Sequence, residues 1–562
     1  MGIPLRVVAA LLSAALIVSG CGAGDGGTEV ASKSDLSNTK VDTSGTLFES
    51  DRVMEVNIEM SPADYQTLRG DGRQLAHAAL GCSAEFEWAH FQAKVSVDGE
   101  VLDNVDIRKK GFIGSLTASR PSFKLNFETH EPGRRFHSLE RMTLNNNRQD
   151  PSNARQCISY DMFRAAGLPA PRCGYARVSV NGDDLGIYTH VESVKKHFLR
   201  RNFSSDAGNL YEAQLGDFGE FTKENYQLKT NQEINDRSDL NRVVEALRAE
   251  DHNLPGLLGQ VVDLDRFLDY WAMEAITGHW DGATGNSNNH LVYRDPNSGL
   301  FTFIPWGTDG SFGLFHPLQV GTGPLYRYTI IPNRLYGIPE YREKFHQRVL
   351  TLLEEVWHPQ AMNAELDRIR DLTGASEADM KSARNFIAAH DGRLRASIAG
   401  ELVQRELVIA DQSTVCRRDV VTEITASFTD GIGQLEFIDE HGDMVTAMAS
   451  AQPPSKENSG VIPLSFGSYF ITVVAPDPVA TRLIFLSVEK SEFGLGEIAF
   501  QGVSTSLFLI QTGGPQGGFL EAFGGPGYIT FTEPPVLGQP ASFEISAELW
   551  FLGDARIFGA SN

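Results

Sequence analysis

The sequence predicts an α+β protein, because strand-like and helix-like patterns occupy separate parts of the chain. Between Leu47 and about Tyr226, apolar and polar residues alternate in short segments, as they do in half-buried strands. Between Asp239 and Gly400, apolar residues recur at helical spacing instead. The strand pattern returns beyond about Val415. We therefore expect a mixed domain over residues 47–410 and a separate β-sandwich-like domain over residues 415–562.

Local signals place the individual elements of this architecture. The dipeptides at 98–99 and 181–182 are Asp-Gly and Asn-Gly, which accept the positive φ that hairpin turns require. A helix is predicted at Asn153–Ala166, where Gly167 ends it. The other predicted elements are strands at Val53–Met60, Ala93–Asp98, Val421–Ile438, Val461–Val474, Thr481–Leu495 and Phe543–Ile557, and helices at Leu264–Ile276, Ile338–Glu355 and Ala375–Leu402. The C-terminal domain holds no group of residues that indicates chemistry, so a structural appendage is favoured over carbohydrate or protein binding.

The start of the chain predicts export. One basic residue within Met1–Arg6 precedes the apolar run Val7–Ser19, which is too short to span a bilayer and reads as a signal peptide over residues 1–20. The sequence Val-Ser-Gly-Cys that ends at Cys21 resembles a bacterial lipobox, which implies cleavage before Cys21 and lipidation of this residue; the alternative is a chance cysteine. Residues 21–46 are rich in Gly, Ser, Asp and Thr, and are expected to form a flexible tether. The expected location is extracytoplasmic, with only the lipid in the membrane of the bacterial envelope (the outer membrane or cell surface in a diderm).

The remaining cysteines and the net charge narrow the classes of site and partner. Apart from Cys21, the chain has Cys82, Cys157, Cys173 and Cys416. In an oxidising compartment these four indicate two disulfides, in any of three pairings, and they lack the paired CxxC clusters of a zinc site. Lys and Arg total 49 against 72 acidic residues, a net charge of −23, and no basic cluster stands out. Nucleic acid is therefore not an expected partner, because binding a phosphate backbone requires concentrated positive charge.

Acids and amides suited to phosphoryl transfer lie close together in the sequence. Asp281 is followed by Asn286 and Asn289, and Asp309 lies in a glycine-rich segment after a hairpin-like stretch. Phosphoryl transfer requires a carboxylate near the acceptor hydroxyl, and an Asp and an Asn that hold metal on the phosphates. An ATP-using transferase is therefore the leading hypothesis, although Asp and Asn are also ordinary turn residues.

Candidate phosphate-binding residues come earlier in the chain. Gly111 and Ser115 follow three cations, and backbone N–H groups at such a turn can cradle phosphate oxygens; a basic hairpin loop is the alternative. Lys124 lies on an alternating strand after this turn, where a kinase fold places its phosphate-binding lysine, although an exposed strand lysine has the same pattern. Glu192 ends another strand before a basic helix. It could pair with Lys124 or a metal, or interact with the helix dipole.

Together these segments resemble the CotH kinase family from about Val53 to Leu402. The markers are Lys110-Gly111 with Ser115, residues 121–127 (PSFKLNF), residues 150–155 (DPSNAR), residues 166–171 (AGLPAP), residues 181–188 (NGDDLGIY) with Glu192, residues 208–211 (GNLY), Asp281 with residues 289–293 (NHLVY), and residues 303–306 (FIPW) with Asp309 and Phe312-Gly313. The resemblance implies an atypical protein-kinase-like fold with a β-rich N-lobe and a helical C-lobe. It also implies a surface or secreted enzyme that uses ATP with Mg²⁺ or Mn²⁺ to phosphorylate proteins.

The resemblance also assigns roles to single residues. Lys124 would contact the phosphates, Asp281 would act as acid–base residue, and Asp309 would hold metal. As second metal ligand, Asn289 fits the family pattern better than Asn286. The family usually has Asp where this chain has Gly307, which removes one candidate ligand. A kinase-like binding or adhesion module with weak or no activity is therefore the second hypothesis, and a metal hydrolase built on His279, Asp281 and His290 is the third.

Overall fold

Seven strands form a closed β-barrel in the first part of the chain. The computed structural model describes residues 42–551 except 75–76, 78–85, 113, 314–322, 403–419, 440, 453–454, 457–467, 476–480, 494–495, 503–504 and 515–516. The strands, in barrel order, are β1 (Val53–Glu59), β2 (Phe91–Val97), β3 (Glu100–Lys110), β4 (Ser122–Asn126), β5 (Arg141–Asn145), β7 (Asp183–Val191) and β6 (Cys173–Val180). All neighbours are antiparallel except β1 and β6, which pair in parallel and close the barrel.

The barrel interior follows directly from the alternation that the sequence shows. In β1, Met54, Val56 and Ile58 are buried while the residues between them face out, because successive strand residues point to opposite sides. Short helices α2 (Pro62–Gly70), α4 (Arg155–Ala165) and α5 (Lys196–Asn202) accompany the barrel. A disulfide joins Cys157 on α4 to Cys173 on β6. This settles one of the open pairings, whereas Cys82 and Cys416 lie outside the described residues.

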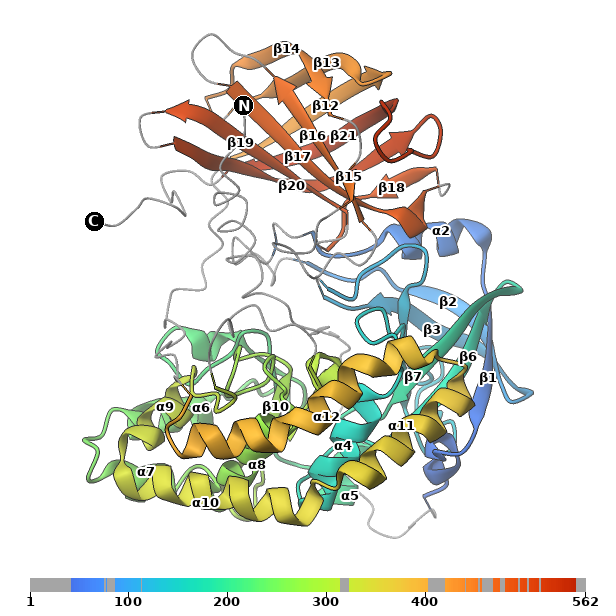
Figure 1. The fold of residues 1–562 in the computed structure, drawn as a ribbon. Helices are drawn as coiled ribbons and strands as arrows, with labels where there is room; N and C mark the ends of the chain where they lie inside the picture. Colours follow the sequence, from blue (N-terminus) through green and yellow to red (C-terminus); the bar gives the residue numbers. More distant parts are fainter. Residues whose placement is uncertain are drawn as a thin grey trace.

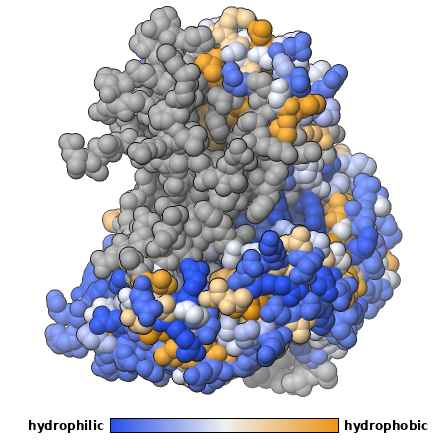
Figure 2. Space-filling model, in the orientation of Figure 1, coloured by the Kyte–Doolittle hydropathy of each residue, from blue (hydrophilic) through white to orange (hydrophobic). Residues whose placement is uncertain are grey.

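A small sheet and a set of helices form the next part, which lies below the barrel and the C-terminal domain in Figure 1. Its antiparallel strands, in sheet order, are β11 (Phe301–Pro305), β10 (His290–Arg294), β8 (Asn209–Ala213) and β9 (Tyr226–Leu228). The helices are α6 (Ser238–Leu247), α7 (Leu254–Leu258), α8 (Leu264–Thr277), α9 (Ile330–Gly337), α10 (Pro339–Val356), α11 (Pro359–Thr373) and α12 (Glu377–Ile398). One apolar core joins these helices to α4. Hydrophilic residues cover most of the helical surface that Figure 2 shows.

The C-terminal part is all β, as predicted, with its own apolar core. Its strands are β12 (Val421–Thr429), β13 (Ile432–Ile438), β14 (Met444–Ala451), β15 (Ser455–Lys456), β16 (Ser468–Ala475), β17 (Thr481–Glu489), β18 (Glu497–Ala499), β19 (Ser506–Gly514), β20 (Gly517–Phe531) and β21 (Phe543–Phe551). They form one continuous antiparallel sheet in which β14 also pairs with β16, rather than two separate sheets. This C-terminal β-domain lies against the barrel near α2 (Figure 1).

The α+β architecture predicted from the sequence is thus confirmed. Predicted and observed helix boundaries agree within about two residues for α4, α8 and α10, and the predicted segment Val421–Ile438 is a hairpin of β12 and β13. Among the described residues, no helix combines the length and the apolar character that crossing a bilayer would require. The predicted signal peptide, Cys21 and most of the predicted tether lie outside the described residues.

Candidate active site between the barrel and the helical part

Helix α8 positions the loop that carries Asp281. Asp263 caps the start of this helix by accepting a hydrogen bond from the Arg266 N–H, and Gly278 ends it in the left-handed conformation, at φ +67°. Near the end of α8, Glu274 is fully buried, and its carboxylate accepts hydrogen bonds from the backbone N–H groups of Ala283 and Thr284, both at 2.7 Å. Glu274 therefore anchors the loop that carries Asp281 to helix α8.

Glu274 is a site residue that the sequence reasoning missed. It also accepts hydrogen bonds from the hydroxyls of Tyr270 at 2.6 Å and Thr284 at 2.5 Å. Burial raises the pKa of Glu274 to about 7, against the opposing effect of these donors. The sequence does place this acid within an apolar run of α8. Because a buried acid is rare unless it has partners, that position could have indicated a functional role for Glu274.

Asp281 lies at the centre of a group of amides. Asn286 and Asn288 donate to its Oδ1 at 2.8 and 3.3 Å, and Asn289 donates to its Oδ2 at 2.6 Å. The side chain is only 7% exposed, and burial raises its pKa well above the usual range. The amide donors oppose this shift, while the negative charge of Asp309 adds to it. The structure thus brings Asp281, Asn286, Asn289 and Asp309 together, as the sequence predicted.

The β10–β11 hairpin delivers Asp309 to this group. After β11 come Trp306, Gly307 in the left-handed conformation at φ +49°, and a 3-10 turn over Thr308–Gly310. Burial raises the pKa of Asp309 to about 6, and the positive charge of Lys110 opposes the shift. A Cβ atom at Gly307 would lie 2.5 Å from Oδ1 of Asn289. An aspartate at this position would therefore have to displace the Asn289 side chain.

One cavity connects Asp309 to the turn that follows β3 and carries Gly111 and Ser115. Its lining includes Lys110, Ser115, Asn145, Gln156 and Asp309, together with Trp306 and Gly307. The Lys110 ammonium donates to Oδ1 of Asn145, whose amide donates in turn to Gln156 at 2.8 Å. Gly111 follows Lys110 with φ +135°, and the Ser115 hydroxyl accepts from the Phe112 N–H at 3.2 Å. Lys110 was only a family marker in the sequence; here it is the cation that faces Asp309.

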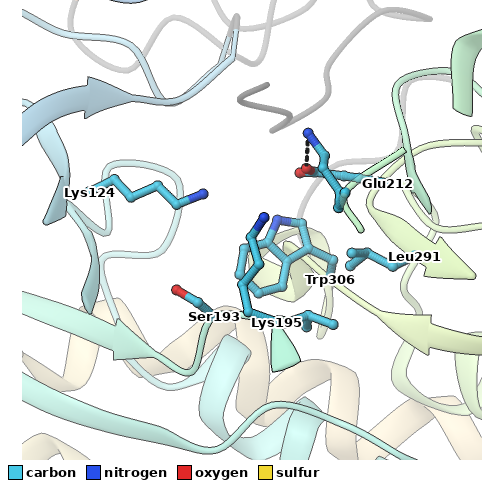
Figure 3. A pocket seen from close by; sticks show the side chains of 8 residues that line it. Lys124, Ser193, Lys195, Glu212, Leu291 and Trp306 are labelled. Carbon is cyan, nitrogen blue, oxygen red and sulfur yellow. Dashed lines mark ion pairs between the residues drawn. The ribbon is translucent and has the colours of Figure 1, made fainter. Parts of the chain in front are cut away.

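A second, small cavity contains the predicted Lys124 (Figure 3). Lys195, Lys229 and Glu212 also line it, and Trp306 borders both cavities. Lys229 is paired with Glu212 at 2.9 Å, whereas the Lys124 ammonium has no hydrogen bond or ion pair with any described residue. Burial lowers the pKa of Lys124 well below the usual range, and the charges of Arg108, Arg141 and Lys195 add to this effect. An anion in this cavity would relieve that repulsion.

The structure corrects the prediction for Glu192. Its buried carboxylate pairs with Arg172 at 2.8 Å and with Arg201, and His197 lies 3.4 Å away, so the predicted pairing with Lys124 is wrong. Burial alone would raise the pKa of Glu192, but the hydrogen bond to His197 and the charges of Arg201 and Arg172 hold it at about 2. Glu192 ties the end of β7 to α5 instead, and it is not among the residues that line the two cavities.

The geometry disfavours the metal-hydrolase hypothesis. His290 uses both ring nitrogens within the protein, on the Asn288 carbonyl at 2.9 Å and the Tyr226 hydroxyl at 3.0 Å. Burial lowers the pKa of both His279 and His290 to about 4, so both rings are neutral at neutral pH. Because a neutral ring can still bind a metal, it is the occupied ring nitrogens of His290 that weigh against this hypothesis. In the part of the chain that the structure describes, no group of three or more His, Cys, Asp and Glu residues is arranged to hold a metal.

A family comparison matches this architecture. The model of the CotH kinase protein family matches residues 107–396, which is about half of the chain and includes both cavities, Asp281 and Asp309. The chain belongs to the CotH kinase protein family. The family assignment that the motifs indicated is thereby confirmed, and it implies the use of ATP and a divalent metal in general terms.

Individual CotH-related proteins share only part of the chain. The inner spore coat protein H of Bacillus subtilis is 26% identical over 205 residues, which cover 34% of this chain and 55% of that protein. The spore coat protein homolog 1 of Rhizopus delemar is 22% identical over 304 residues, 46% of this chain and 49% of that protein. The chain therefore spans about half the length of these relatives. A solved structure of the Helicobacter pylori proinflammatory kinase CtkA is 13% identical, covers 51% of this chain and 94% of its own, and has a TM-score of 0.28, too low to support an argument about the fold.

Proposed function

We propose that this CotH-family chain is an exported, lipid-anchored kinase that transfers the γ-phosphate of ATP to hydroxyl groups of surface or secreted proteins. One observation carries the proposal. Lys110, Lys124 and Asp309 line two cavities that share Trp306, and Asp281 lies close enough to Asp309 for the charge of Asp309 to act on it. Phosphoryl transfer needs this combination, because the enzyme mainly positions charged groups and stabilises their charge.

The residues present fit a divalent metal such as Mg²⁺ or Mn²⁺. These ions prefer oxygen ligands, and Asp309 supplies a carboxylate near Asp281, to which Asn286 and Asn289 donate hydrogen bonds. Oδ1 of Asn286 is buried and accepts no hydrogen bond from the described residues, which is unusual for a buried acceptor. This orphaned oxygen favours Asn286 as the second ligand over the Asn289 that the sequence favoured. When bound, the metal would neutralise charge on the phosphates.

Three side chains of the protein are assigned roles in the transfer itself. Asp281 is proposed as the base, because a carboxylate with a raised pKa accepts a proton readily from an acceptor hydroxyl. The acceptor oxygen forms a bond to the γ-phosphorus, the bond from that phosphorus to the β–γ bridging oxygen breaks, and ADP leaves with the electron pair. Lys124 offers an amine whose protonated form incoming phosphates would stabilise, and Lys110 offers a second cation next to Asp309.

The test is incubation of purified protein lacking residues 1–41 with labelled ATP and Mg²⁺ or Mn²⁺. We expect autophosphorylation, and its loss in Asp281→Asn and Asp309→Asn. Asp265→Asn, an exposed acid in the first turn of α8, is the matched control and should stay active. Absence of nucleotide-induced stabilisation at millimolar ATP would refute the proposal. For the lipid anchor, Cys21→Ser should move the full-length protein from the membrane fraction to the soluble one and abolish labelling by radioactive palmitate.

Gly307 favours a second candidate, a CotH-family binding or adhesion module with weak or no catalysis. The carboxylate that the family usually has at this position is missing, and Asn289 fills the space beside it. This candidate predicts nucleotide binding without measurable transfer. Binding of labelled ATP with no label on any protein, in either metal, would therefore select it over the kinase.

A further inference from the structure

The C-terminal β-domain contacts the barrel at the segment that leads out of α2. Gly502 donates its N–H to the Arg73 carbonyl at 2.9 Å, and Gln74 forms an isolated parallel β-bridge with Gly502. The Gln74 side chain also donates to the Phe500 carbonyl at 3.2 Å. These main-chain contacts fix the position of the domain relative to the barrel (Figure 1).

From this position, a buried carboxylate of the β-domain reaches the glycine turn (residues 111–112 and 114–119). Glu492 is 0% exposed, and its Oε1 accepts from the Ala118 N–H at 2.7 Å and from the Thr117 hydroxyl at 3.2 Å. Its second oxygen accepts from Thr505 of its own domain at 2.9 Å. A backbone N–H bound to a carboxylate is one of the stronger hydrogen bonds in proteins. Glu492 therefore joins the two parts of the chain firmly.

A second carboxylate of the β-domain contacts the glycine turn indirectly, through Arg148. Glu489 pairs with Arg148 at 3.0 Å, with side chains only 9% and 7% exposed. The same guanidinium donates to the carbonyls of Gly114 at 3.0 Å and Leu116 at 3.3 Å, both in the glycine turn. Removing one partner of a buried ion pair leaves an uncompensated charge, so this link resists opening. The glycine turn is thus held on two sides by acids of the β-domain.

Strand β3 links the same interface to the cavity. Successive strand residues point to opposite sides, and its last two residues are lysines. Lys109 points to the interface, where its ammonium donates to the Gln501 side chain and to the Arg69 carbonyl. Lys110 points the other way, into the cavity with Asp309. Movement of the β-domain would therefore displace the strand that carries Lys110.

We propose that Glu489 and Glu492 are positioning residues for nucleotide phosphates, through which the β-domain sets the affinity of the kinase-like site for ATP. This inference rests on the proposed function and concerns the same site. Both acids lie outside residues 107–396, the segment that matches the family, so the device belongs to this chain's added domain. The physical reason is preorganisation, because a turn already held in one conformation loses less entropy when it binds phosphate.

The test compares Glu492→Gln and Glu489→Gln with wild type in the protein that lacks residues 1–41. Glu497→Gln is the control, since Glu497 is an exposed acid of the same domain. Hydrogen exchange of peptides covering residues 111–119, without nucleotide, should be faster in both variants and unchanged in the control. Circular dichroism checks that each variant is folded, and if one is not, the other carries the test.

Calorimetry with ATP and with adenosine, each with Mg²⁺, gives the decisive readout. We expect both variants to bind ATP about tenfold more weakly, the effect of one lost charge-assisted contact, with adenosine binding unchanged because adenosine has no phosphates. Equal losses for ATP and adenosine would show general destabilisation and overturn the proposal, as would unchanged ATP affinity. A wild-type chain that binds no nucleotide would overturn the proposed function together with this inference. If the two variants bind ATP more weakly than wild type but bind adenosine equally well, the result supports both the proposed function and this inference.

Discussion

Adding a side chain at Gly307 should destabilise the candidate site in a defined way. The backbone there is left-handed, which costs a non-glycine residue about 1 kcal/mol. The new Cβ would lie 2.5 Å from Oδ1 of Asn289, so Asn289 must move and lose its 2.6 Å hydrogen bond to Asp281, worth about 2 kcal/mol for a charged acceptor. We therefore expect Gly307→Ala to lower the free energy of unfolding by about 3 kcal/mol.

Gly307→Asp separates the steric effect from the effect of charge. Without metal it should be less stable than Gly307→Ala, because a third carboxylate joins Asp281 and Asp309. With saturating MgCl₂ it should recover more stability than Gly307→Ala, because a metal compensates the added charge. Urea unfolding of wild type and both variants, with and without MgCl₂, measures this. A Gly307→Ala variant as stable as wild type would refute the steric argument, and equal magnesium responses of the two variants would refute a metal-ligand role for an acid at 307.

Three further predictions concern single groups. The pKa of Asp309 is raised from 3.8 to about 6 in the folded state, so the folded protein loses stability as the pH rises from about 4 through 6. Asp309→Asn should remove that loss. In metal-free urea unfolding at pH 7, its free energy of unfolding should be about 2 kcal/mol higher than that of wild type, after discounting for residual exposure. Glu274→Ala should cost about 3 kcal/mol, because it leaves the buried N–H groups of Ala283 and Thr284 without acceptors, and hydrogen exchange at these two amides should rise while Asp265→Ala leaves it unchanged. Loss of the Cys157–Cys173 disulfide in the double serine variant should cost about 3 kcal/mol, as expected for a separation of 16 residues, and a melting temperature unchanged by the substitution would contradict this.

Local signals explain which parts of the structure the sequence predicted. Helix α8 was predicted to within one residue, because its apolar residues recur at helical spacing within one short stretch. Asp281, Asn286 and Asn289 were grouped correctly for the same reason, since one loop carries them all. Where an element depends on residues that are close in the sequence, the sequence pattern was sufficient to predict it.

Contacts between distant segments explain the errors and omissions. A pairing of Glu192 with Lys124 was one of the alternatives, because the sequence could not show that Arg172 and Arg201 lie beside Glu192. Lys110 and Lys109 look alike in sequence, and only the packing of β3 determines which of them faces Asp309. The contact between Glu492 and Ala118 joins residues 374 positions apart, a separation that no local pattern reports.

The closed barrel has a consequence for how a protein substrate could be recognised. An open sheet presents unpaired backbone groups at its edge strands, and many peptide-binding domains use such an edge to add the peptide as a further strand. Here β1 pairs with β2 on one side and with β6 on the other, so β1 leaves no such edge. At β1, a protein acceptor of the proposed kinase therefore could not add as a further strand, and this strand could take part in its recognition only through side chains.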